Sequence, residues 1–200
     1  MMEAVRNGAW AKSGGAPTVE SIVIPHGKCF YTDWKIPFVK FRIVMDVKVI
    51  SNSSDYGPII DSYCHTNNDF MGFLIRFQLK NTNDAIVLWQ QNSASGTNRF
   101  VNTTITKGEW YHIDASWNTT YINSQRFDRT LPDGKYINQI SNNPIVFNGG
   151  HNNTIPTFSL HAEYKTIFCY EDNVLVHEYR PTETGFLDTV TGIEHGLYTI

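Results

Sequence analysis

The sequence is poor in charged residues. Only 18% of its 200 residues are Asp, Glu, Lys or Arg, whereas an average globular protein has about 25%. The 16 basic and 19 acidic residues give a formal net charge of −3, and the basic residues form no run. Without a basic patch, the chain lacks the electrostatic attraction that nucleic acids and anionic membrane surfaces require. We therefore expect neither of these partners.

Long apolar runs and cysteines are also scarce. No stretch approaches the roughly 18 apolar residues of a membrane span, and the opening residues lack the apolar segment of a signal peptide. Cys29, Cys64 and Cys169 are far apart, odd in number and surrounded by apolar residues, which fits neither a disulfide framework nor a CxxC metal site. We expect a soluble, unprocessed chain whose cysteines are reduced packing residues.

Apolar and aromatic residues are plentiful, at 41% and 14% of the chain. From Ser21 onward they form short alternating runs, broken about every 8 to 12 residues by turn formers, which is typical of an all-β sandwich or barrel. The clearest strand is residues 38–50. Every second residue from Val39 to Val49 is apolar, and the opposite face carries Lys40, Arg42, Asp46 and Lys48. Because this run is long for a strand, we expect a bend or bulge in it.

Further runs predict hairpins. Residues 71–79 and 84–91 flank a turn-forming Asn-Thr-Asn and predict an antiparallel pair. Residues 109–118 precede residues 121–127, which turn at Asn123-Ser124. Residues 157–173 predict one long strand that reaches a turn at Asp172-Asn173. Many antiparallel strands in one domain imply two facing sheets about 10 Å apart.

The N-terminal residues 1–24 differ from the rest. They are mainly small and polar, with a single large anchor at Trp10. Such a segment can become ordered when its ring is buried on a partner surface. We therefore expect an extended N-terminal arm over residues 1–24 that docks through Trp10, followed by one β-sandwich domain over residues 25–200.

Two segments carry a family resemblance. Residues 107–127, KGEWYHIDASWNTTYINSQRF, resemble the centre of laminin-G-like domains, although Ser124 stands where that family's hairpin often has Gly. Residues 167–192, IFCYEDNVLVHEYRPTETGFLDTVTG, resemble the closing segment of laminin-G-like proteins common in bacteriophage virions and gut-bacterial surface proteins. The resemblance as a whole extends over roughly residues 28–198, and these two segments are its most specific parts. The resemblance implies an all-β, two-sheet antiparallel jelly-roll sandwich of the concanavalin A-like class.

The resemblance also implies a function. It favours a non-enzymatic structural protein of a bacteriophage virion, such as a head decoration, head fibre or tail component on the particle surface. The arm would bind other virion proteins, and the sandwich would display its loops to host-surface glycans. The alternative is a carbohydrate-binding module of a bacterial surface or secreted protein, and a glucanase-like glycoside hydrolase comes third. The sequence has no heptad or repeat that would indicate a homo-oligomer, so the oligomeric state stays open.

Catalytic patterns are not found. Glycoside hydrolysis needs two carboxyl groups about 5 to 9.5 Å apart, and no alternate carboxylates on one strand supply them. Glu171 and Asp172 are adjacent in a turn, where their side chains point apart, and Asp114 is expected to be a satisfied or solvated carboxylate. His161 and Glu163 share a strand face, but zinc chemistry would require a third ligand. We expect no catalytic residue.

A glycan site would place an aromatic ring beside amide and carboxylate groups, because sugar rings have apolar faces ringed by hydroxyls. Among the aromatic residues of the strand over 109–118, Trp110 is the one that we expect to be exposed. The candidates are Trp110, Trp89, Asn92, Asn118, Tyr121, His151 and Asn152. Laminin-G-like domains often hold one calcium ion on the rim, and Asx-rich loops offer Asp55, Asp69 and Asp84 as ligands. The same residue types are ordinary turn formers, so calcium stays open, and no other cofactor is expected.

Overall fold

The computed structural model describes ten ranges of the chain, namely residues 17–37, 40–52, 56–62, 64–66, 69–80, 83–91, 101–116, 119–128, 144–152 and 155–200. The elements in these ranges are strands, and no helix occurs among them, which confirms the all-β prediction. Accordingly, the described ranges contain no helix that is long and apolar enough to cross a membrane.

The strands follow one another closely along the chain. They are β1 (Ile22–Ile24), β2 (Lys28–Tyr31), β3 (Phe41–Asn52), β4 (Tyr56–Asp61), β5 (Cys64–Thr66), β6 (Asp69–Lys80), β7 (Asn83–Gln91), β8 (Val101–Thr104), β9 (Trp110–Ser116), β10 (Thr119–Ile122), β11 (Gln125–Asp128), β12 (Val146–Phe147), β13 (Gly149–Asn152), β14 (Ile155–Tyr164), β15 (Ile167–Glu171), β16 (Val174–Pro181), β17 (Gly185–Asp188) and β18 (Ile193–Thr199).

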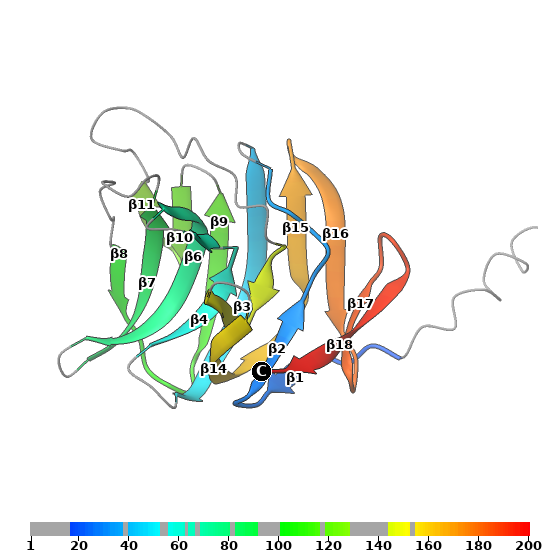
Figure 1. Ribbon diagram of the computed structural model, residues 1–200, viewed down its shortest axis with the longest axis horizontal. Helices are drawn as coiled ribbons and strands as arrows, with labels where there is room; N and C mark the ends of the chain where they lie inside the picture. Colours follow the sequence, from blue (N-terminus) through cyan, green and yellow to red (C-terminus); the bar gives the residue numbers. More distant parts are fainter. Residues whose placement is uncertain are drawn as a thin grey trace, which may run out of the picture.

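Antiparallel pairing arranges most of these strands in two layers (Figure 1), with the short strands β5 and β13 added beside β6 and β14. The first, which we call the β3 layer, begins with the order β11–β10–β9–β3. Both β14 and β15 pair with the other edge of β3. Next to them, β1 pairs with β14, β16 pairs with β15, and β17 pairs with β16. The second, the β6 layer, has the order β18–β2–β12–β4–β6–β7–β8. Strand β18 also pairs with β17, and so connects the two layers.

Strand β3 has the predicted alternation. Its described apolar residues from Phe41 to Val49 are buried at every second position, and the residues between them are more exposed. The expected bulge is also present: His161 pairs with Ser51, but the next residue of β14, Ala162, pairs with Val49, so that Ile50 is the extra residue. The predicted hairpins are confirmed as β6–β7 and β10–β11. Asn123 takes the left-handed conformation in the second turn, with φ 51°.

One strand boundary differs from the sequence-based expectation. The single strand expected over residues 157–173 is two strands, because Tyr164 pairs with Val47 but Phe168 pairs with Val44. Three residues therefore lie opposite two, and the edge is interrupted between β14 and β15. Within the segment 1–24, where an extended arm is expected, Ile22–Ile24 pair with β14 and Thr18 forms a bridge with Thr182. Residues 1–16, with Trp10, lie outside the described residues.

One hydrophobic core lies between the layers. Phe30 of β2 stacks on Phe147 of β12 and on Phe186 of β17, with ring centroids 5.6 and 4.3 Å apart, so aromatic packing crosses from one layer to the other. Cys29 and Cys169 are free and buried, as expected of packing residues. Burial raises the pKa of the Cys29 thiol to about 11, so it stays protonated at neutral pH. The Cys64 side chain lies outside the described set.

Asn148 connects the layers through hydrogen bonds. Its side chain is fully buried, and its Nδ2 donates to the carbonyls of Lys28 in β2 and Leu160 in β14, at 3.0 and 2.8 Å. The Tyr164 hydroxyl donates to its Oδ1 at 3.3 Å. The backbone N–H of Asn148 donates to Ile59 of β4. A left-handed φ of 61° makes this geometry possible, and Asn tolerates that conformation better than most residues.

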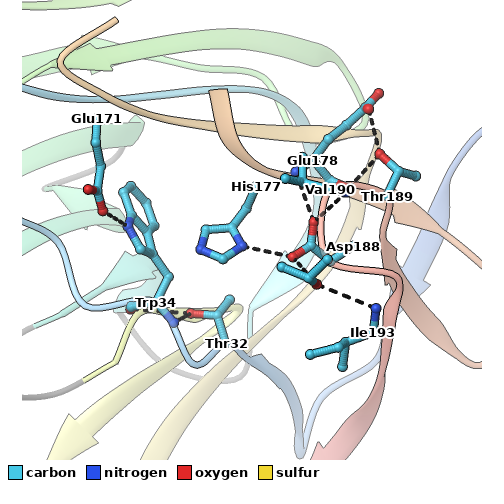
Figure 2. Close-up of polar contacts among 10 residues, drawn as sticks. Thr32, Trp34, Glu171, His177, Glu178, Asp188, Thr189, Val190 and Ile193 are labelled. Atoms are coloured by element: carbon cyan, nitrogen blue, oxygen red, sulfur yellow. Dashed lines mark hydrogen bonds and ion pairs between the residues drawn. The ribbon is translucent and has the colours of Figure 1, made fainter. Parts of the chain in front are cut away.

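A buried carboxylate fastens the C-terminal strands. Asp188 of β17 is 1% exposed, and its Oδ2 lies 2.7 Å from His177 Nδ1 of β16 and accepts a hydrogen bond from Thr191 Oγ1 at 2.6 Å. Its Oδ1 accepts hydrogen bonds from the backbone N–H groups of Val190 and Glu178. Figure 2 shows these contacts converging on the one carboxyl group. They hold the β17–β18 turn against β16.

Replacing Asn148 by Gly tests the connection between the layers. Glycine keeps the left-handed backbone accessible but leaves two buried carbonyls without their donor, so we expect a loss of roughly 2 to 4 kcal/mol in the free energy of unfolding. Urea denaturation measures it. Asn123→Gly, at an exposed turn with a similar φ, is the control and should change stability by less than about 1 kcal/mol. Equal losses in the two variants would contradict the role of the Asn148 side chain.

Asp188 predicts an acid dependence of stability. Burial by itself raises the pKa of Asp188, but the hydrogen bonds from His177, Thr191 and the two backbone amides outweigh it and lower the pKa below its ordinary value of 3.8. The stabilisation is therefore complete above the ordinary value and is lost as the pH falls through the lower folded-state pKa.

Urea denaturation over a pH series checks this dependence. Asp188→Asn should lose roughly 1 to 3 kcal/mol at neutral pH and should lose less further stability on acidification than the parent protein. The exposed Asp172 provides the control variant Asp172→Asn, which should follow the parent curve. An Asp188→Asn variant with the parent's acid dependence would show that another group carries it.

Candidate functional site

A groove of about 440 Å³ lies at one end of the outer face of the β3 layer, the face turned away from the core. We call it the Tyr121 groove. It is lined by Lys40, Phe41, Arg42, Asp114, Ser116, Thr119, Tyr121, Asp172 and Asn173. Most of these side chains are polar, and they come from the strands β3, β9 and β10, from Lys40 just before β3, and from the β15–β16 turn.

Strand pairing brings the groove residues together. Tyr121 of β10 is directly opposite Asp114 of β9, and Arg42 of β3 is opposite Ser116 of β9. Arg42 and Asp114 are therefore diagonal neighbours on one face, within reach of long side chains. The Arg42 guanidinium donates from Nε and Nη2 to the two oxygens of Asp114, at 2.8 and 2.7 Å.

The Arg42–Asp114 pair is held in place. Two parallel hydrogen bonds fix the carboxylate in the plane of the guanidinium. The hydrogen bond with Asp114 raises the pKa of Arg42 above its ordinary value. The guanidinium also lies 5.6 Å from the centroid of the Tyr170 ring of β15, which is cation–π distance. Asp114 is thus a satisfied carboxylate, as expected from the sequence.

A tight turn forms the end of the groove. Asp172 and Asn173 have φ values of 47° and 65° between the paired residues Glu171 and Val174, which is the two-residue turn of type I′. The Asp172 N–H donates to the Lys40 carbonyl at 2.9 Å, and the Lys40 Nζ lies 3.0 Å from Asp172 Oδ1. The turn therefore presents a carboxylate and an amide side chain at a defined position.

Glu171 faces away from this site. Its Oε1 accepts a hydrogen bond from Trp34 Nε1 at 2.6 Å (Figure 2), whereas its neighbour Asp172 lines the groove. The expectation that these adjacent carboxylates point apart is confirmed. They do not form a pair that could act on one substrate bond.

Tyr121 and Trp110 are the two candidate aromatics whose side chains are described, and they differ in availability. Tyr121 is 37% exposed and lines the groove. Trp110 is half-buried, and the ammonium groups of Lys48 and Lys165 lie 4.8 and 4.9 Å from its ring. Lys48 is also paired with Glu163. Because its ring already contacts two cations, Trp110 is a less suitable platform for a sugar than Tyr121.

The structure does not test the remaining candidate residues, because it describes none of their side chains. Trp89 lies in β7, and His151 and Asn152 lie in β13, but nothing is described of their side chains. Asn92 and Asn118 lie outside the described residues. Of the calcium candidates, Asp69 and Asp84 belong to β6 and β7, at paired positions near the ends of these strands, and Asp55 lies outside the described ranges.

The His177–Asp188 pair has the arrangement of a base and its orienting carboxylate. Thr191 Oγ1, a hydroxyl that contacts this pair, donates its hydrogen bond to the Asp188 carboxylate and not to the imidazole. A histidine that activates a nucleophile must accept the proton of that nucleophile. The pair therefore serves the β17–β18 turn, and the Tyr121 groove is the better candidate site.

Sequence reasoning missed most of the groove. The sequence predicts only that Lys40 and Arg42 lie on a solvent-exposed strand face and that Asp172 lies in a turn. The available signal was that the strands at 38–50 and 109–118 carry opposite charges on their polar faces, which pair favourably when the strands are neighbours. Strand adjacency was not deduced from the sequence.

Comparisons with known proteins support the fold. No protein-family model matches the sequence, and no curated protein matches it. A sialidase carbohydrate-binding module of class CBM40 from Ruminococcus gnavus, solved with α2,3-sialyllactose, is similar in structure, with a TM-score of 0.55 and 11% identity over 80% of this chain and 95% of that chain. The same module solved with α2,6-sialyllactose gives a TM-score of 0.51 and 10% identity, over 75% and 92% of the two chains.

A Trypanosoma rangeli sialidase in complex with sialic acid is also similar, with a TM-score of 0.50 and 11% identity over 78% of this chain. The match covers 27% of the sialidase chain. At these identities the likeness concerns the fold. Together with the all-β, two-layer arrangement, it shows that the chain is a concanavalin A-like jelly-roll sandwich.

Proposed function

We propose that the protein is a non-enzymatic, lectin-like domain that binds glycans in the Tyr121 groove. The observation that carries the proposal is an exposed tyrosine ring beside a preformed Arg42–Asp114 pair and a turn that presents Asp172 and Asn173. An aromatic face with a few fixed polar groups is the usual chemistry of a sugar site.

Each part of the groove has a role toward a sugar. The Tyr121 ring packs against the apolar face of a pyranose. The carboxylates of Asp114 and Asp172 accept hydrogen bonds from hydroxyl groups, and the Asn173 amide both donates and accepts. Because Arg42 already fixes Asp114, and the type I′ turn fixes Asp172, little side-chain entropy is lost when a ligand binds.

The charges of the groove favour a neutral glycan. Its two cations, Lys40 and Arg42, are each paired with a carboxylate that also lines the groove, so the formal charges cancel. An anionic sugar would have to compete with Asp114 or Asp172 for its cation, whereas a neutral sugar uses the paired groups as they stand. We therefore infer a hydroxyl-rich, uncharged ligand.

The structural neighbours support sugar binding as a use of this fold. The Ruminococcus gnavus module was solved with sialyllactose and the Trypanosoma rangeli protein with sialic acid. These ligands belong to those proteins, and both carry a charge. The preference for a neutral glycan rests on the groove of this chain alone.

Binding without cleavage is the proposed activity. Hydrolysis of a glycoside requires one protonated carboxylic acid together with a second carboxylate. Both carboxylates that line the groove have a cationic partner, Asp114 by a bidentate contact and Asp172 by a single one. In these contacts both carboxylates act as hydrogen-bond acceptors, which is the role that the proposed binding site needs.

Replacing Tyr121 by Ala tests the glycan site. Binding is measured by isothermal titration with neutral and sialylated oligosaccharides first selected on an array. Tyr121→Ala should weaken binding of the neutral ligand at least tenfold, because loss of ring stacking costs about 1 to 3 kcal/mol. Tyr198→Ala is the control, since Tyr198 is exposed but does not line the groove.

Asp114→Asn tests the charge argument in the same assay. It leaves Arg42 unpaired, so the ratio of sialylated to neutral affinity should rise relative to the parent protein. Two results would contradict the proposal: no array glycan bound by the parent, or equal binding by the parent and Tyr121→Ala. Release of cleaved sugar that Asp114→Asn abolishes would make the protein a hydrolase.

The glycan-binding proposal does not determine the kind of protein to which this domain belongs. We propose a bacteriophage virion protein, on the resemblance of residues 167–192 to virion proteins, with a bacterial surface or secreted module as the alternative. Much of the resembling segment has a structural role: Asp188 fastens the turn, and a Cβ on Gly185 would lie 2.0 Å from the His195 carbonyl oxygen. The segment therefore supports the fold more strongly than it supports the location.

Deletion of residues 1–16 tests the virion proposal. If the N-terminal arm docks through Trp10, the truncated chain should keep its thermal unfolding midpoint but disappear from purified particles in mass spectrometry. Trp10→Ala in the full chain should reduce incorporation in the same direction. Full incorporation of the truncated chain would contradict docking through the arm, and absence of the parent protein from particles would favour the bacterial module.

A further inference from the structure

Two histidines meet at a serine on the β3 layer. His26 follows β1, which pairs with β14 through Ile24 and Ala162. His161 of β14 is the direct partner of Ser51 of β3. Residues that are far apart in the sequence are thereby brought to one place, at the end of β1.

The two imidazoles aim at the same oxygen. His26 Nε2 lies 3.2 Å from Ser51 Oγ, and His161 Nδ1 lies 3.3 Å from it. The ring centroids are 5.7 Å apart, with an angle of 57° between the planes. One nitrogen of each ring therefore faces the Ser51 hydroxyl, so both rings present a nitrogen to the same small region of the surface.

The backbone holds this arrangement. The bulge at Ile50 changes the register so that Ser51 is opposite His161. His161 is half-buried within a paired strand, whereas His26 is exposed on the turn that follows β1. One ligand is thus fixed, and the other can adjust by side-chain rotation.

Sequence reasoning paired His161 with Glu163 and lacked a third group. In the structure, Glu163 is engaged elsewhere: Lys48 forms an ion pair with it, and Ser21 donates a hydrogen bond to it. His26 takes the place of the expected partner, because β1 runs along β14. The described part of the chain contains no group of three or more His, Cys, Asp or Glu side chains that could hold a metal ion, so two histidines are the protein ligands available here.

We propose that His26 and His161 form a binding site for one divalent late-transition-metal ion. Imidazole is a preferred ligand of Zn²⁺, Ni²⁺ and Cu²⁺, with metal–nitrogen distances of about 2.0 to 2.1 Å for zinc. The ion replaces the hydrogen bonds of the two rings to Ser51 Oγ, and the serine oxygen or water completes its coordination. By the usual order of divalent affinities, Cu²⁺ binds most tightly.

The ion would act as a clamp. His26 belongs to the segment after β1, and His161 belongs to β14, so a shared ion connects the N-terminal segment to the centre of the β3 layer. A ligand that binds the folded state alone raises the apparent stability. The site uses no residue of the Tyr121 groove and is independent of glycan binding.

The test is titration of the full chain with CuCl₂ and ZnCl₂ by isothermal calorimetry. The parent protein should bind one ion, and His26→Ala and His161→Ala should each weaken binding at least tenfold. His112→Ala is the matched control, because His112 is on the same layer but pairs with Asp46; its affinity should stay within twofold of the parent's. Electron paramagnetic resonance of the Cu²⁺ complex should show coupling to two imidazole nitrogens.

The thermal unfolding midpoint without metal checks that each variant folds. If His161→Ala unfolds, His26→Ala, at an exposed turn, carries the test alone. No binding by the parent protein would overturn the proposal. Equal affinity of the parent, His26→Ala and His112→Ala would also overturn it, since this would mean an adventitious ion only.

Discussion

When two sheets pack face to face, the polar atoms of the segments that cross between them are buried and need hydrogen-bond partners. Asn148 provides such hydrogen bonds here. Its amide bonds carbonyls of β2 and β14, and its backbone bonds β4, so a single buried residue fixes one layer relative to the other. These hydrogen bonds matter because a buried carbonyl without a partner lowers the free energy of unfolding by a sizeable part of a domain's net stability. The left-handed conformation required at this position also explains why an asparagine occupies it.

Because the two layers are fixed relative to each other, the outer face of the β3 layer can carry functional side chains. The β3 layer keeps its apolar residues toward the core, which leaves the opposite face free for polar chemistry. On that face, strand pairing places Arg42 beside Asp114 and Tyr121, and it places His161 beside Ser51 and His26. Both proposed sites therefore take part of their ligand groups from paired strands, which hold these groups in position before the ligand arrives, whereas His26 lies on the turn after β1.

Local patterns predicted much of the fold. The alternation in β3, the hairpin turns and the buried cysteines follow from side-chain period and turn chemistry, which are short-range properties. The partners of each strand are long-range, and the sequence did not reveal them. For that reason the sequence predicts an exposed Trp110 but not the contacts of Lys48 and Lys165 with its ring. It likewise places His161 with Glu163 and does not indicate His26. The break between β14 and β15 likewise depends on the register with β3.

The central claim is that the Tyr121 groove binds a neutral glycan, and the most direct measurement is a two-dimensional amide NMR titration with such an oligosaccharide. The account predicts saturable shifts that concentrate on the backbone amides of Arg42, Asp114, Tyr121 and Asn173, while amides of β2 and β18 stay unchanged. Shifts confined to other strands, or none at saturating ligand, would contradict it.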